Sequence, residues 1–249
     1  GNFGLAMAHA CARRGVELTV FVSENANETK VEAIERYGVR IVRSGRDFDA
    51  AKAAAKAYAL ANDRRFVEDG AEPEIAEGAG TIAVEMLARE RPHTILVPLG
   101  NGALLAGIAR WTKAYAPETR VIGVCSAGAR VMFDALKSEP STNWPKATAE
   151  TIADGIAVRV PVPQALEDLN GLVDDVVLVR DSHLIDAMGL MYAREGLMRE
   201  PAAVAGLAAI ACHPGRFRGQ RVATILTGRN LTNTQVKAWL TGAGPRAVS

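Results

Sequence analysis

The chain has 249 residues, with 29 basic and 28 acidic side chains and a formal net charge of +1 at pH 7. This length allows one large domain or two smaller ones with a buried core. The balanced charge favours neither nucleic acid nor an anionic membrane as a partner. No stretch of about 18 uninterrupted apolar residues occurs, so no membrane span is expected.

The three cysteines, Cys11, Cys125 and Cys212, lie far apart and form no C-x-x-C pair. An odd number of cysteines without metal-ligand spacing indicates a reducing compartment, so we expect a cytoplasmic protein. Each cysteine is expected to be a small buried apolar residue. The chain opens on GNFG at residues 1–4, with neither an initiator Met nor a signal pattern. This predicts a start inside a longer protein.

Helices and strands alternate at short intervals in the first quarter of the chain. Residues 1–4 are interpreted as a turn, Gly15 as a C-terminal helix cap, and Ser44 or Asp47 as an N-cap. The predicted helices are 5–14, 30–37 and 47–62, and the predicted strands are 16–22 and 39–42. Turn residues at 68–73 place a domain crossing there, which predicts domains at 1–70 and 71–249.

The same alternation continues to the end of the chain. Asp181 or Ser182 is expected to cap a helix, and Asp174 and Asp175 to begin a strand and face solvent. The predicted helices are 74–89, 129–136, 181–194 and 202–212; the strands are 94–97, 120–125, 173–179 and a buried one at 221–226; residues 137–149 form a surface loop. This order predicts an α/β fold of parallel sheets wound with helices.

Residues 95–107 are predicted to form a strand, a tight loop and the start of a helix. The first N–H groups of such a helix lack intrahelical partners and carry the positive end of its dipole, so they bind anions, most often phosphate. Gly100, Gly102 and Ala103 allow a ligand to approach the backbone. The dinucleotide and P-loop fingerprints are both absent, and an ordinary turn remains the alternative. The small polar turn at 227–230 also follows a predicted strand, so the two turns are expected to face one cavity.

Other chemistries lack support in the sequence. The four histidines, His9, His93, His183 and His213, are scattered without ligand spacing. No G-x-S-x-G motif occurs, so Ser126 is not expected to be a hydrolase nucleophile. No carboxylate pair points to a glycosidase.

Seven short segments together resemble the fold-type II (tryptophan synthase beta-like) pyridoxal-phosphate enzymes, most closely the threonine/serine ammonia-lyase (dehydratase) branch with its relative serine racemase. The segments occur in the family's order over nearly the whole chain. They are 1–4 (GNFG), similar to the end of a Ser-x-Gly-Asn-x-x-Gly loop, 77–83 (EGAGTIA), similar to a Gly-Gln-Gly-Thr segment, 97–107, similar to the tetraglycine phosphate loop, 151–155 (TIADG), 172–176 (LVDDV), 200–202 (EPA) and 227–230 (TGRN).

The resemblance implies two doubly wound parallel-sheet domains with a cofactor cleft between them, the small domain being incomplete at its N-terminus. It implies pyridoxal 5'-phosphate as the cofactor, with Thr227 facing the ring nitrogen and Asn2 hydrogen-bonding the phenolic oxygen. Gly155 would offer a carbonyl near the reacting centre and Glu200 a nearby carboxylate. The phosphate would bind the backbone N–H groups of Gly100, Asn101, Gly102, Ala103 and Leu104.

Substrate binding is implied for Gly1, Asn2 and Phe3, with backbone N–H groups of this loop holding the substrate carboxylate. Phe3 stands where the family has His, which leaves the threonine assignment open. The carboxylates of the divalent-cation site in serine racemase-like members are missing, since Cys125, Ala129 and Val131 occupy that region, so no metal is expected. The Schiff-base lysine precedes the Asn loop in this family and is therefore expected upstream of Gly1, so no catalytic residue is assigned within these residues.

The implied function is a pyridoxal-phosphate-dependent ammonia-lyase that converts a 3-hydroxy amino acid, such as L-threonine or L-serine, to a 2-oxo acid and ammonia. The resemblance also implies a homodimer. A racemase, a beta-replacement enzyme or a threonine-synthase-like enzyme on the same scaffold is an alternative. A non-catalytic homologue without the lysine, or a nucleotide-binding doubly wound protein, is another. Residues 1–249 alone are expected to be inactive, and the short stretch after Asn230 predicts no C-terminal amino-acid-sensing domain.

Overall fold

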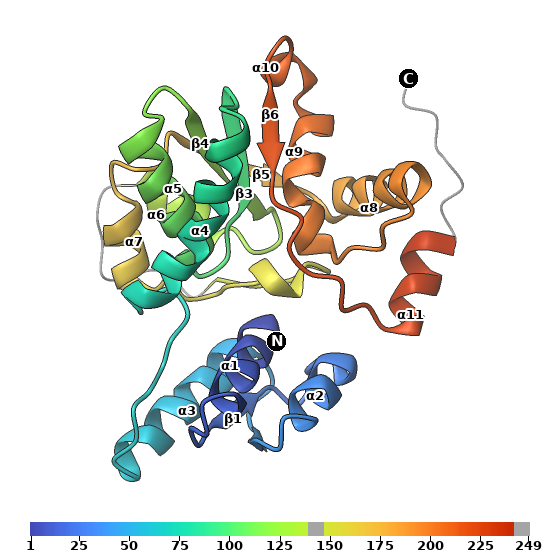
Figure 1. Cartoon of the computed structure of the whole chain (residues 1–249). Helices are drawn as coiled ribbons and strands as arrows, with labels where there is room; N and C mark the ends of the chain where they lie inside the picture. Colours follow the sequence, from blue (N-terminus) through green and yellow to red (C-terminus); the bar gives the residue numbers. More distant parts are fainter. Residues whose placement is uncertain (139–146, 242–249) are drawn as a thin grey trace. The chain divides into compact units, whose positions relative to one another are not determined.

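The computed structural model describes residues 1–138 and 147–241. The chain divides into two compact units (Figure 1). The first unit comprises residues 1–67 together with 230–234, and the second comprises residues 68–229 and the chain after residue 234. Both units contain parallel sheets with helices between the strands, which confirms the predicted α/β class.

The first unit is a two-stranded parallel sheet with three helices. Its elements are α1 (Asn2–Ala12), β1 (Thr19–Val22), α2 (Glu28–Glu35), β2 (Arg40–Arg43) and α3 (Phe48–Ala61). Strands β1 and β2 pair in register from Thr19 opposite Arg40 to Val22 opposite Arg43. The core is a small cluster of buried aliphatic side chains from α1, β1 and α2: Ala8, Val20, Val22, Val31 and Ile34.

Two helix starts in this unit bear on the predictions. Asp47 caps α3, since its side chain accepts a hydrogen bond from the Ala50 N–H at 2.9 Å, which decides between the two proposed caps. The predicted turn at residues 1–4 is wrong, because α1 begins at Asn2 with Gly1 as its N-cap. Gly4 continues this helix because a Cβ there would lie 2.9 Å from Val20 Cγ1. Close packing on the strand therefore outweighs the low helix propensity of glycine.

The second unit contains a four-stranded parallel sheet in the order β5-β4-β3-β6. Helices α4 and α5 lie on one face and α8 and α9 on the other (Figure 1). The strands are β3 (Thr94–Pro98), β4 (Arg120–Ser126), β5 (Asp175–Val179) and β6 (Val222–Thr224). The helices are α4 (Pro73–Arg89), α5 (Ala103–Tyr115), α6 (Val131–Lys137), α7 (Pro163–Leu169), α8 (Asp181–Glu195), α9 (Ala205–Cys212) and α10 (Pro214–Phe217), with short 3-10 turns at Asp154–Ile156 and Pro201–Val204. Helix α11 (Asn233–Val236) begins in the residues of the first unit and ends in those of the second, and a π-helical turn follows at Lys237–Thr241.

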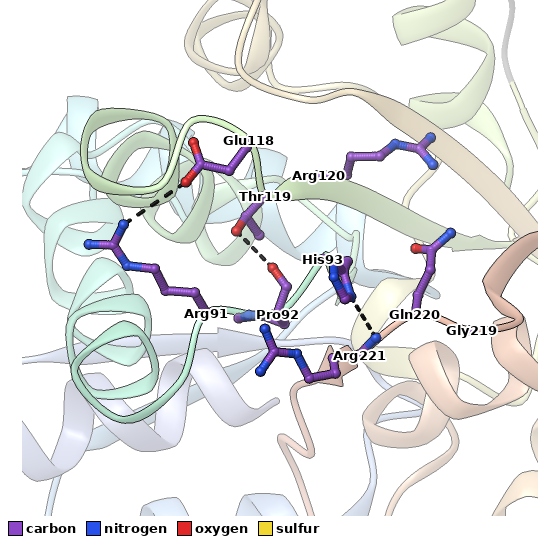
Figure 2. A pocket seen from close by; sticks show the side chains of 9 residues that line it. All are labelled: Arg91, Pro92, His93, Glu118, Thr119, Arg120, Gly219, Gln220 and Arg221. Carbon is purple, nitrogen blue, oxygen red and sulfur yellow. Dashed lines mark hydrogen bonds and ion pairs between the residues drawn. The ribbon is translucent and has the colours of Figure 1, made fainter.

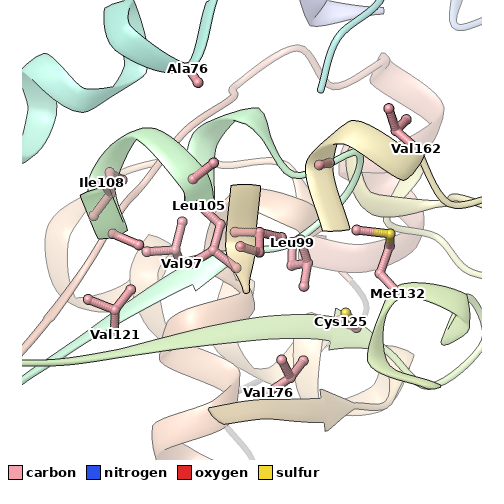
Figure 3. Close-up of a cluster of buried hydrophobic side chains, with 14 of the residues drawn as sticks. Ala76, Val97, Leu99, Leu105, Ile108, Val121, Cys125, Met132, Val162 and Val176 are labelled. Carbon is pink, nitrogen blue, oxygen red and sulfur yellow. The ribbon is translucent and has the colours of Figure 1, made fainter. Parts of the chain in front are cut away.

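A large cluster of buried side chains in this unit lies between the sheet and the α4–α5 pair (Figure 3), and α8 and α9 also contribute buried residues. Every residue of β3 is buried, as its continuous apolar run predicts for a central parallel strand. The two helices approach closely at Gly107, where an added Cβ would overlap the Ala76 carbonyl oxygen and lie 2.7 Å from the Gly80 nitrogen. Small residues at this crossing therefore place α5 against α4.

Several sequence-based predictions need correction. Arg180, rather than Asp181 or Ser182, is the N-cap of α8. The strand predicted as buried at 221–226 is shorter and half-buried, because β6 is the last strand in the sheet order. The helix predicted at 202–212 starts as a 3-10 turn at Pro201–Val204 and becomes α-helical at Ala205. The strand predicted from residue 16 begins at Thr19. Residues 139–146 of the predicted surface loop lie outside the described residues.

The carboxylates at the start of β5 also differ from expectation. Asp174 is exposed as predicted, although it accepts hydrogen bonds from Lys113 and from the Val121 N–H. Asp175 is half-buried and pairs with Lys137 and Arg216, so the prediction that it faces solvent is wrong. None of the helices in the described ranges is long and apolar enough to cross a membrane.

Candidate functional site

The amino terminus of α5 is the centre of the candidate site. Gly102 is its N-cap and has φ +106°, a left-handed conformation that favours glycine. The first intrahelical hydrogen bond runs from the Ala106 N–H to the Gly102 carbonyl at 2.8 Å. The N–H groups of Ala103 and Leu104 precede that bond and have no acceptor within the helix. Together with the positive end of the helix dipole, they form an anion-binding arrangement.

Three glycines at this loop are required by close approaches from other segments. A Cβ on Gly100 would lie 2.9 Å from the Gly155 carbonyl oxygen, and one on Gly102 would lie 2.8 Å from the Ala165 Cβ. Gly70, with φ +90°, lies so close to the backbone of Asn101 that a side chain would overlap it. The loop is therefore held between residues 70, 155 and 165. Sequence reasoning missed Gly70, although its place in the non-periodic stretch at 68–73 was a local signal for a special backbone conformation.

Asn101 provides a direct test of whether the loop suits an anionic ligand. Only 7% of this residue is exposed, and its Oδ1 atom has no hydrogen-bond partner among the described residues. A buried amide oxygen without a partner is unfavourable. A ligand with hydrogen-bonding oxygens can satisfy it, because a half-turn of the amide exchanges its acceptor and its donors. The positive-φ cap and the helix amino terminus fit a phosphate group, and the Asn101 amide can donate to it after that half-turn.

The turn at residues 227–230 lies at the same end of the sheet as this loop. Strands β3 and β6 are parallel neighbours, paired from Thr94 opposite Val222 to Leu96 opposite Thr224. Gly100 follows the carboxyl end of β3, and Thr227 follows the carboxyl end of β6. Thr227 is exposed at this edge. The arrangement is that of an open parallel sheet, where ligands bind beyond the carboxyl ends of the strands.

Gly155 and Glu200 lie in segments that meet at this edge. The Gly155 carbonyl packs on Gly100, and a Cβ on Gly155 would lie 3.1 Å from the Ala202 Cβ. Glu200 is 2% exposed, and its backbone N–H donates to the Gly228 carbonyl at 3.1 Å. The structure therefore brings together the segments of Gly100, Gly155, Glu200 and Thr227, which are separated by up to 127 residues in the chain.

The predicted substrate-binding residues belong to the first unit. Gly1, Asn2 and Phe3 form the start of α1, and Asn2 is exposed. The Asn2 Oδ1 atom accepts a hydrogen bond at 2.9 Å from the Asn230 side-chain amide, and the Asn230 carbonyl accepts one from the Asn27 side chain at 3.3 Å. The roles of these three residues toward a ligand stay predictions.

Two surface hollows are lined by other residues than these. One, of about 470 Å³, lies at the amino ends of β3 and β4, where Arg91 faces Glu118 and the His93 ring accepts a hydrogen bond from the Arg221 N–H (Figure 2). The other, of about 390 Å³, is lined by Ala127, Leu178, Arg180, His183, Cys212 and His213. Within the described ranges, no three His, Cys, Asp or Glu side chains are arranged to hold a metal ion.

The cysteines are free thiols and differ in burial. Cys125 is fully buried in β4, as predicted, and burial raises the pKa of its thiol to about 12. Cys11 and Cys212 are only partly buried, so the prediction that each is a buried apolar residue is wrong for these two. Burial also raises the pKa of the Cys212 thiol above its usual range.

The chain is similar to amino-acid lyases and racemases of known structure or assigned activity. It is 34% identical over 233 residues to an L-threonine ammonia-lyase of Geobacter sulfurreducens, covering 93% of this chain and 57% of the relative. The processed form of threonine deaminase isoform 2 from Solanum lycopersicum superposes with a TM-score of 0.88 at 25% identity, covering 98% of this chain and 71% of that one. Maize serine racemase superposes with a TM-score of 0.82 at 26% identity, covering 96% and 73%.

This chain spans between 55% and 57% of the length of the first two curated relatives that it matches, the second being a biosynthetic L-threonine dehydratase of Bacillus subtilis. The family described as pyridoxal-phosphate dependent enzymes matches residues 1–228, which include the loop at Gly100, Gly155, Glu200 and Thr227. The chain therefore belongs to the family of pyridoxal-phosphate dependent enzymes.

Proposed function

We propose that the protein is an ammonia-lyase that acts on a 3-hydroxy amino acid, such as L-threonine or L-serine, and releases a 2-oxo acid and ammonia. The observation that carries the proposal is the 34% identity to the L-threonine ammonia-lyase of Geobacter sulfurreducens across 93% of this chain. The anion-binding loop supports it, since the left-handed Gly102 and the unpartnered N–H groups at the start of α5 fit a cofactor phosphate.

Residues 100–104 would hold the phosphate of pyridoxal phosphate through their backbone N–H groups. The bound cofactor supplies an electron sink that stabilises negative charge on the substrate carbon next to the amino group. Thr227 would place a neutral hydroxyl at the ring nitrogen. A hydroxyl cannot hold a positive charge there as a carboxylate would, which suits elimination of the β-hydroxyl. The Gly155 carbonyl and the buried Glu200 would orient groups around the reacting carbon.

The first unit would bind the substrate. The N–H groups at the start of α1, beside Gly1, Asn2 and Phe3, suit a substrate carboxylate, because a helix amino terminus favours negative charge. The proton at the substrate α-carbon would be removed by a lysine that precedes residue 1 in the whole protein. We therefore propose that residues 1–249 alone bind the cofactor without turning over substrate. Measured turnover by a mass-verified protein of these residues would contradict that.

Product analysis tests the reaction. The whole protein is incubated with L-threonine, L-serine or 3-hydroxyaspartate, the 2-oxo acid is measured by coupled reduction, and the remaining amino acid is resolved by chiral chromatography. The expected result is 2-oxo acid and ammonia in equal amounts, with a G100A variant strongly impaired and a G78A variant unchanged. Racemised amino acid without 2-oxo acid would contradict the lyase.

A racemase is the second candidate, and the likeness to maize serine racemase favours it over other reactions on this scaffold. Chiral chromatography in the same experiment separates the two activities. We also propose that the protein is a cytoplasmic homodimer. A mass twice that of the protomer by light scattering would agree with the dimer, and a monomeric mass at all concentrations would not.

A further inference from the structure

A chain of buried and half-buried hydroxyl and carboxylate groups connects the segment before Gly155 to strand β4 and helix α8. Ser126, the last residue of β4, is fully buried and donates from Oγ to the Thr151 Oγ1 atom at 2.8 Å. The Thr151 hydroxyl donates to Asp181 Oδ1 at 2.5 Å, and the Ile152 N–H donates to Asp181 Oδ2 at 3.0 Å. Both carboxylate oxygens of Asp181 are thus used by two consecutive residues of one irregular segment.

The direction of these bonds follows from the chemistry of the carboxylate. An ionised carboxylate only accepts hydrogen bonds, so Thr151 must donate its one hydroxyl proton to Asp181. Thr151 can then only accept from its other neighbours, which are Ser126 Oγ and the Ala153 N–H at 3.2 Å. Asp181 therefore sets the orientation of the whole chain of hydroxyls. As the first residue of α8, its negative charge is also favoured by the helix dipole.

This network lies a few residues from the candidate site. The turn Asp154–Ile156 follows directly and is closed by the Ile156 N–H donating to the Ala153 carbonyl at 3.0 Å. The segment is also fixed upstream, where the Glu150 N–H donates to the Gly128 carbonyl at 2.9 Å. Little freedom is left between the Asp181 anchor and the Gly155 carbonyl, which packs on Gly100.

We propose that Asp181 is a positioning residue for the phosphate-binding loop, acting through Thr151 and Ile152 to hold the Gly155 carbonyl against Gly100. The inference rests on the proposed cofactor site, since it assigns a role toward the loop that would bind the phosphate. The Asp181 carboxylate accepts its hydrogen bonds from Thr151 and Ile152, so its effect on the loop is indirect.

The coupling can be measured without cofactor by hydrogen exchange on the whole protein. The T151V variant keeps the shape of the side chain and removes the hydroxyl, and D181N replaces one acceptor oxygen by a donor that faces an N–H or O–H group. We expect exchange to become at least about threefold faster in peptides covering 150–156 and also in peptides covering 100–104. T151S restores the hydroxyl and should return both segments to the rates of the parent protein.

D134N is the matched control, because it makes the same chemical change in an exposed pair between Asp134 and Arg130, the N-cap of α6. It should leave exchange at 100–104 unchanged. Faster exchange confined to 150–156 in T151V would overturn the proposal, as would unchanged exchange in both segments. If D181N fails to fold, the comparison of exchange rates between T151V and T151S tests the coupling instead.

Cofactor titration gives the second readout. Pyridoxal phosphate quenches tryptophan fluorescence when it binds nearby, and Trp111 lies on α5. We expect about tenfold weaker binding in T151V and recovery in T151S. If the parent protein bound no pyridoxal phosphate, the proposed function would fail while the exchange experiment would still test the coupling. If T151V bound it as tightly as the parent, Asp181 would have no positioning role.

Discussion

The Gly155 carbonyl oxygen lies 2.9 Å from the point that a Cβ atom on Gly100 would occupy. Two backbones 55 residues apart therefore touch at the loop before α5, with no room for a side chain between them. The contact joins the loop that suits a phosphate to the carbonyl that the family resemblance places near the reacting centre. It makes Gly100 necessary for a steric reason.

Replacing Gly100 by Ala is expected to weaken pyridoxal phosphate binding at least about tenfold and to destabilise the fold by roughly 1–3 kcal/mol. The neighbour that would have to move is backbone, which cannot give way as a flexible side chain can. Fluorescence titration and urea unfolding measure the two effects. G78A is the control, because nothing lies within 4 Å of a Cβ there. In an exposed helical position it should stabilise by about 0.5–1 kcal/mol. Equal behaviour of the two variants would contradict the steric account.

Replacing Gly107 by Ala should destabilise the protein by about 2–4 kcal/mol. The new methyl group would overlap the Ala76 carbonyl and crowd the Gly80 nitrogen, which forces α5 away from α4. Thermal or urea unfolding measures the loss. G189A, on the open face of α8, has nothing within 4 Å of its Cβ and should be neutral or slightly stabilising. A G107A variant as stable as the parent would mean that the two helices separate at little cost.

The ion pairs of Asp175 make a pH-dependent contribution to the free energy of unfolding. Burial alone would raise the pKa of its carboxyl, but hydrogen bonds from Lys137, Arg216 and the Val176 N–H outweigh burial and lower it to about 2. Because the folded pKa lies below the unfolded value of 3.8, the stabilisation is complete above that value and is lost as the pH falls toward 2. D175N should therefore cost about 2 kcal/mol at pH 7 and progressively less below pH 4.

Urea unfolding of the parent and of D175N at pH 7, 5 and 3 measures this difference. D134N serves as the comparison, since Asp134 forms an exposed ion pair and should change the free energy of unfolding by less than about 0.5 kcal/mol. A D175N difference that stayed constant from pH 7 to pH 3 would show that the ion pairs of Asp175 do not cause it.

Cys125 should resist alkylation in the folded protein. Its thiol is fully buried, and burial raises its pKa to about 12, so almost no thiolate forms at pH 7. Iodoacetamide followed by peptide mass spectrometry should leave Cys125 unmodified until guanidinium unfolds the chain. Cys11, which is partly exposed, serves as the internal comparison and should react first. Modification of Cys125 at the rate of Cys11 would show that β4 opens readily.

The local features of the fold and the site could be predicted from the sequence. The Asp47 helix cap, the buried strand β3 and the loop before α5 depend on neighbouring residues, so a short stretch of sequence is enough to predict them. The left-handed conformation of Gly102 is likewise a local feature of this loop. The turn predicted at residues 1–4 failed because packing of Gly4 on Val20 outweighs local propensity. The pairing of Asp175 with Arg216 was missed because the two residues lie 41 positions apart.

The sequence by itself determined the alternation of helices and strands, the small residues at the loop of Gly100 and the family to which the chain belongs. Only the tertiary structure decided the strand order β5-β4-β3-β6, the contact of Gly155 with Gly100 and the anchoring of Thr151 by Asp181. The physical reason is the range of the forces involved. Hydrophobic periodicity, capping and turn preference act over a few residues. Contacts between distant segments arise from dense packing, in which many weak interactions select one arrangement.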